Sequence, residues 1–152
     1  MEIPLFEQVG ELVRTLVPES LGPVRYRSHR RGVKVWIGAE QATRLHFEAQ
    51  LIPRRLVDDR EGTALEVGFH AEDGDVAVND AALERIAAAE DAWRSELGAE
   101  PEAGPFLGRP DDWRRVSETW IEPELEDEEL AFELASRLAD YLTQIQPLLG
   151  GE

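Results

Sequence analysis

Two pairs of residues with the same histidine-x-glutamate spacing are the part of this sequence best suited to chemistry. They are His46 with Glu48 and His70 with Glu72. Residues two apart on a strand point to the same face of a sheet, so two neighbouring strands would bring both pairs within coordinating distance. Imidazole and carboxylate groups together suit zinc and similar transition metals. Cross-strand ion pairs explain the spacing equally well in a chain with 32 acidic residues.

A nuclease site would need more than this region offers. Glu48-Ala49-Gln50 loosely resembles the second half of the PD-(D/E)xK signature of restriction nucleases. That chemistry needs an acidic residue on the preceding strand to share the metal, and usually a lysine to orient the nucleophile. Residues 33–37 supply no acid, and Gln50 stands in the place of the lysine. We therefore do not expect nuclease chemistry at this strand.

Other common catalytic signatures are also missing. The sequence contains no G-x-S-x-G nucleophile elbow, no G-x-G-x-x-G loop and no Walker loop. It contains no cysteine, which excludes disulfides, thiolate metal ligands and cysteine nucleophiles and fits a reducing compartment. No complete catalytic constellation remains, and we predict no cofactor.

The spacing of apolar residues predicts the elements that must position the two pairs. Apolar residues recur with helical period over 5–16, and Pro18 ends this first helix. The period then changes to two, which predicts four strands joined by short connections. These strands cover residues 24–29, 33–37, 44–51 and 65–70. Such an antiparallel meander has one apolar face and one polar face.

The segment after these strands is expected to form a helix and then a loop. Asn79 or Asp80 is suited to the N-cap of a second helix. Residues 99–112 contain three prolines and two glycines, so we expect them to form a long loop.

The last part of the chain completes a single domain over residues 1–152. We expect a fifth strand at 115–121, a final helix that opens at Pro123, and a frayed C-terminus at 148–152. The predicted fold class is α+β, with element order α-β-β-β-β-α-β-α. It is a two-layer sandwich in which three helices cover one face of an antiparallel sheet of four to five strands, and the other sheet face stays open.

The open face is the predicted binding surface, because all three histidines and several basic residues share its strand parity. Its predicted members are Arg25, Arg27, His29, Lys34, Trp36, Arg44, His46, Glu48, Gln50 and His70, with Glu66 and Glu72 beside them. An ordinary solvated sheet face would show the same alternation.

The charge of the chain changes sign along its length. Residues 25–60 contain nine basic and four acidic residues, whereas residues 61–152 contain six basic and 24 acidic residues. A surface divided by sign can steer a partner. Arginines on the sheet would suit phosphates, and Trp36 or Tyr26 would stack on a base, but a net charge of −16 repels nucleic acid at long range.

Residues 44–149 resemble a family of small bacterial α+β domains of unknown function, which occur alone or attached to nuclease-like modules. The likeness lies in Leu65-Glu66-Val67-Gly68-Phe69-His70, in Leu83, Ile86 and Glu90, in Ser95-Glu96-Leu97-Gly98, in the stretch Trp113 to Trp120 and in a long final helix. The resemblance implies an α+β order and no catalytic residues.

The leading prediction is therefore a non-catalytic binding or regulatory module that uses the open face to hold a protein partner or a second copy of itself. The first alternative is a metal-assisted hydrolase at His46, Glu48 and His70. The second is an accessory protein that associates with nucleic acid. The sequence has no apolar run that is long enough for a membrane span, and we expect a cytoplasmic protein.

Overall fold

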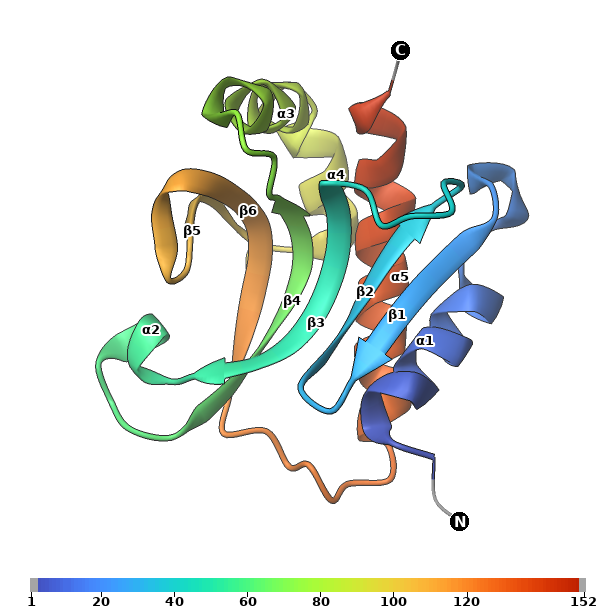
Figure 1. The fold of residues 1–152 in the computed structure, drawn as a ribbon, viewed down its shortest axis with the longest axis vertical. Coiled ribbons are helices and arrows are strands. Elements are labelled where there is room, and N and C mark those ends of the chain that lie inside the picture. Colours follow the sequence, from blue (N-terminus) through green and yellow to red (C-terminus); the bar gives the residue numbers. More distant parts are fainter. Residues whose placement is uncertain (1–2, 151–152) are drawn as a thin grey trace.

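The computed structural model describes residues 3–150 and has two layers (Figure 1). One layer is an antiparallel sheet of six strands in the order β1-β2-β3-β4-β6-β5. The other layer consists of helices that pack on one face of this sheet. The predicted α+β class is confirmed, although the described residues form six strands and five α-helices, which is more of each than expected.

The bounds of the elements are as follows. The helical segments are α1 (Leu5–Leu16), the 3-10 turn η1 (Glu19–Leu21), α2 (Arg55–Asp58), α3 (Val76–Ala88), α4 (Glu90–Leu97) and α5 (Leu130–Leu149). The strands are β1 (Val24–His29), β2 (Gly32–Ile37), β3 (Leu45–Pro53), β4 (Thr63–Ala71), β5 (Glu102–Phe106) and β6 (Arg109–Ile121). No helix among residues 3–150 combines the length and the apolar character that a membrane crossing requires.

The first four strands form the meander that the period of two predicts. Each of β1 to β4 pairs with the next strand in the chain, and all pairs are antiparallel. The apolar parity of β3 and β4, represented by Phe47 and Phe69, is fully buried beneath α5. Burial of one such side chain contributes about 1.5–3 kcal/mol, so this shared core fixes the strand parity.

The prediction of a loop at residues 99–112 is wrong, because this segment forms β5 and the first part of β6. Pro105 lies on β5, an edge strand, where a missing N–H group is tolerated. The register between the two strands jumps where Phe106 pairs with Arg109 while Pro105 pairs with Arg114. The prolines and glycines therefore mark an irregular hairpin.

Helix boundaries also differ from the prediction. The second predicted helix is two helices, α3 and α4, and its N-cap is Asp75, which accepts a hydrogen bond from the backbone of Ala77 at 3.0 Å. The final helix begins at Leu130, not at Pro123. Residues 148–149 belong to α5, while the rest of the predicted frayed end at 151–152 lies outside the described residues.

The sheet curves strongly, and β6 carries β5 across the face that lies away from the helices (Figure 1). The ring of Phe106 on β5 lies 4.7 Å from the ring of His70 on β4, although β6 separates the two strands in the sheet. Gly68 permits the close approach of β6 to β4, because a Cβ atom there would lie 2.5 Å from the carbonyl oxygen of Val116. Curvature thus closes, around His70, the sheet face that is predicted to be open.

Candidate metal centre

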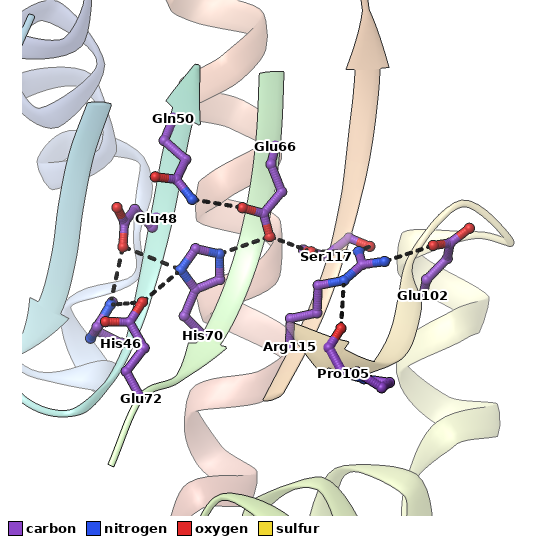
Figure 2. Close-up of polar contacts among 10 residues, drawn as sticks. All are labelled: His46, Glu48, Gln50, Glu66, His70, Glu72, Glu102, Pro105, Arg115 and Ser117. Carbon is purple, nitrogen blue, oxygen red and sulfur yellow. Dashed lines mark hydrogen bonds and ion pairs between the residues drawn. The ribbon is translucent and has the colours of Figure 1, made fainter. Parts of the chain in front are cut away.

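The pairing of β3 with β4 brings the two histidine-x-glutamate pairs together. His46 lies directly opposite His70, and Glu48 lies opposite Gly68. Glu72 follows β4 and continues the ladder, since its backbone N–H donates to the carbonyl oxygen of Arg44 at 2.9 Å. The four side chains project from the same face and converge (Figure 2). One nitrogen or oxygen atom of each lies within 4.8 Å of those of the other three, so the proximity predicted from the spacing is confirmed.

Each histidine in this quartet faces both carboxylates at nearly equal distance. His46 Nε2 lies 3.2 Å from Glu48 Oε1 and 3.3 Å from Glu72 Oε2. His70 Nδ1 lies 3.2 Å from each of the same two oxygens. The four atoms therefore form a closed ring in which nitrogen and oxygen alternate.

These distances are long for hydrogen bonds between charged groups, which are usually about 2.7–2.9 Å. The neighbouring contact between His70 Nε2 and Glu66 Oε2 has that length, 2.8 Å. Ligands about 2.0–2.2 Å from a tetrahedral ion lie about 3.3–3.6 Å apart. The 3.2–3.3 Å edges of the ring lie at the long end of the hydrogen-bond range and at the short end of this ligand spacing. An N–H group shared between two oxygens is poorly aligned with each of them, whereas one ion can contact all four atoms directly.

The outer nitrogen of each histidine has a hydrogen-bond acceptor. His46 Nδ1 lies 2.7 Å from the carbonyl oxygen of Thr43, and His70 Nε2 lies 2.8 Å from the carboxylate of Glu66. Carbonyl and ionised carboxylate oxygens only accept, so both outer nitrogens carry a proton. In neutral imidazoles the inner nitrogens then present lone pairs to the centre of the ring, which is the usual arrangement of metal-bound histidine.

Without an ion, the same geometry requires two charged histidines. Burial alone would lower the pKa of His70, but the carboxylates of Glu66, Glu48 and Glu72 outweigh it and raise this pKa well above its ordinary value of 6.5. The pKa of His46 rises for the same reason, against the same effect of burial. Burial would raise the pKa of Glu72, but its hydrogen bonds with the two histidines lower it to about 2. The ring therefore holds either two protons or one divalent cation at the same total charge.

Glu66 is the centre of a second layer of contacts. It lies two residues before Gly68 on β4, His70 lies two residues after it, and the two side chains meet at 2.8 Å. Gln50 Nε2 donates to Glu66 Oε1 at 2.9 Å, and the hydroxyl of Ser117 donates to Glu66 Oε2 at 2.6 Å. The Glu66 carboxylate is thereby fixed from β3, β4 and β6 (Figure 2).

Arg115 connects this second layer to β5. Its Nη1 group donates to Ser117 Oγ at 2.9 Å, and its Nη2 group donates to Glu102 at 2.8 Å. Its Nε group donates to the carbonyl oxygen of Pro105 at 3.3 Å. Only 7% of Arg115 is exposed, so the guanidinium joins the hairpin to the site from inside the protein.

The expected exposure of the predicted binding face is wrong at the centre of that face and holds only at its margin. Its central residues are buried, namely Trp36, His46, Glu48 and His70. The rest are half-buried (Lys34 and Gln50) or exposed (Arg25, Arg27, His29 and Arg44). Trp36, predicted to be an exposed stacking residue, is 5% exposed and donates from Nε1 to the carbonyl oxygen of Ala39 at 2.7 Å. The β5–β6 hairpin closes the face over His70, which a local sequence pattern does not reveal.

Sequence reasoning placed Glu66 on this face but missed its role, and it missed Ser117 and Arg115 altogether. Gly68 between Glu66 and His70 was a usable signal, because a glycine on a strand marks a close approach of side chains or backbone. The register of β6 against β4 gave no such signal, since polar residues on β6 point to both faces.

A separate polar cluster lies on the opposite face of the sheet, under α5. Glu118 on β6 is 7% exposed and accepts a hydrogen bond from the hydroxyl of Tyr141 at 2.7 Å. It also accepts from Arg137 Nε at 2.9 Å and from Trp120 Nε1 at 2.9 Å. This carboxylate is as well satisfied as Glu66 but has no contact with the quartet, so it provides a matched control for Glu66.

Comparisons with protein-family models, with curated proteins and with solved structures find no match to this chain. The resemblance to small bacterial domains therefore stays a prediction.

Proposed function

We propose that this protein is a metal-binding domain that holds one divalent transition-metal ion, most favourably zinc, through His46, Glu48, His70 and Glu72. The observation that supports this most strongly is the closed ring of two nitrogens and two oxygens with edges of 3.2–3.3 Å. Two protonated histidines would favour shorter, paired contacts, as His70 makes with Glu66.

The donor set favours zinc over the common alkaline-earth ions. Zinc accepts histidine nitrogen and carboxylate oxygen in four-coordinate tetrahedral sites. Calcium and magnesium prefer six or more oxygen ligands, which this buried ring does not offer. Imidazole ligands also favour copper and nickel, so these ions are expected to compete with zinc.

The number of protein donors indicates a structural or regulatory ion and not a catalytic one. Catalytic zinc sites usually keep three protein ligands and an open position for water, whereas structural sites use four. Both histidine side chains here are at most 1% exposed, and the two glutamate side chains are 12% and 13% exposed. This supports the non-catalytic reading over a hydrolase, with the ion fastening β3 to the end of β4.

Metal analysis of the purified protein tests this proposal. After dialysis against a small excess of zinc, we expect one ion per chain, with the loss of binding in His46→Ala and in His70→Ala. His29→Ala is the matched control, because His29 is exposed on β1 and should leave the stoichiometry unchanged. Absence of zinc, copper, nickel and cobalt binding by the folded wild-type protein would contradict the proposal.

We propose, second, that the exposed margin of the predicted face lets one copy of the chain hold another. β1 is an edge strand that exposes Arg25, Arg27 and His29. The same chain carries six acidic residues within 122–129, all of them exposed, so a second copy supplies a segment of complementary charge. The expected cytoplasmic location, supported by the lack of cysteine, belongs with this proposal.

Light scattering at several ionic strengths tests the self-association. We expect an average mass above that of the monomer at low salt, and a return to the monomer in 0.5 M salt and in Arg25→Glu/Arg27→Glu. A monomer at high protein concentration in low salt would refute it. Salt-sensitive retention of an oligonucleotide by the wild type alone would favour nucleic acid as the ligand of β1.

A further inference from the structure

His70 can bind a metal through Nδ1 only while its proton resides on Nε2. A neutral imidazole has one proton and two nitrogens, so a neighbouring group must choose between the two forms. The group that lies against Nε2 is the carboxylate of Glu66, at 2.8 Å, and both residues are at most 1% exposed. An ionised carboxylate accepts and cannot donate, so it holds the proton on Nε2.

The surroundings of Glu66 are arranged to keep this carboxylate ionised and in place. Gln50 donates to one of its oxygens, and the hydroxyl of Ser117 donates to the other, which also receives the proton of His70. Three donors thus converge on one carboxylate. An amide in the same position would direct its own NH₂ group at one of these donors.

The direction of the Ser117 hydroxyl is itself set by Arg115. The guanidinium donates to Ser117 Oγ at 2.9 Å, so the hydroxyl proton is left free to point at Glu66. Arg115 is held in turn by Glu102 and by the carbonyl oxygen of Pro105, both on β5. A continuous path of directed hydrogen bonds therefore runs from the hairpin to His70.

We propose that Glu66 is the positioning residue of the metal centre, and that the β5–β6 hairpin holds it for this task through Ser117 and Arg115. The inference rests on the proposed function. If Glu66 has this role, the β5–β6 hairpin belongs to the site although it supplies no metal ligand. Removal of such an outer partner typically lowers metal affinity about 10–100-fold while the ligands themselves stay in place.

Titration with Co²⁺, followed by its visible absorption, tests the inference on the intact protein. We expect Glu66→Gln to bind cobalt about 10–100-fold more weakly than the wild type and with a changed spectrum. Nitrogen NMR of the zinc-loaded wild type should place the remaining His70 proton on Nε2. Glu118→Gln is the matched control, since it removes another buried carboxylate with three hydrogen-bond donors, on the opposite face of the sheet. It should bind with the affinity and spectrum of the wild type.

Ser117→Ala provides a second reading that does not depend on the folding of Glu66→Gln. It removes one donor to Glu66 and should lower the affinity several-fold. If the wild type binds neither cobalt nor zinc, the proposed function fails and the inference fails with it. The other outcome is that the wild type binds cobalt, while Ser117→Ala and folded Glu66→Gln both have the affinity and spectrum of the control Glu118→Gln. That result would overturn the inference alone.

Discussion

Replacement of His70 by alanine should destabilise the metal-free protein more than any other single change at the site. His70 is fully buried and contacts all three carboxylates, with Nδ1 shared by Glu48 and Glu72 and Nε2 facing Glu66. Removal of one partner from a buried ion pair costs about 3–5 kcal/mol. Loss of the edge-to-face contact with Phe106 adds about 0.5–1.5 kcal/mol. The sum is a large part of the roughly 5–15 kcal/mol that stabilises a typical domain.

Urea unfolding in the presence of a chelator measures this loss in the free energy of unfolding. The raised pKa of His70 predicts how the loss depends on pH. The folded-state pKa of His70 lies well above 6.5, so its stabilising effect is complete below pH 6.5 and is lost as pH rises through the folded pKa. The difference between wild type and His70→Ala should therefore be largest near pH 6 and shrink at alkaline pH. His29→Ala, on the exposed edge strand, should change stability by less than about 0.5 kcal/mol. A loss below about 1 kcal/mol for His70→Ala at pH 6 would refute the reasoning.

Three further predictions follow from the same contacts. Zinc binding near pH 6 should release close to two protons per ion, because the pKa values of His46 and His70 are both raised in the metal-free protein. Calorimetry in buffers of different ionisation enthalpy measures the number of protons released, and a value of zero would contradict the prediction. Gly68→Ala should destabilise the protein by at least about 2 kcal/mol in urea unfolding, because the φ of 150° at Gly68 disfavours other residues and a Cβ atom there would meet β6. An unchanged urea midpoint would disprove the close approach of β4 and β6 at this position. Metal-free protein should lose stability as pH falls from 4.5 towards 2, since the pKa of Glu72 is lowered to about 2 and that of Glu66 is also lowered. An unfolding free energy that does not change over this pH range would contradict the prediction.

The parts of the fold that could be predicted are those in which local pattern and final environment agree. Apolar residues alternate with polar residues along β1 to β4, because one face of these strands meets the helices and the other carries the polar site. The two histidine-x-glutamate pairs follow directly from that parity, since the register of β3 against β4 sets His46 opposite His70.

The parts that were missed depend on long-range contacts. β6 shows poor alternation because buried polar residues lie on both of its faces: Ser117 points to Glu66 on one side, and Glu118 points to Tyr141 on the other. Pro105 suggested a loop, but it occupies an edge strand, where its missing N–H has no consequence. The closing of the polar face needs the curvature of the whole sheet, which no window of sequence encodes.

A crystal structure of the zinc-soaked protein, with anomalous scattering recorded at the zinc edge, tests the central claim most directly. The account predicts one peak inside the ring of His46, Glu48, His70 and Glu72, about 2.0–2.2 Å from one atom of each. A folded protein that shows no peak there, with the two histidines hydrogen-bonded to the carboxylates at about 2.8 Å, would contradict it.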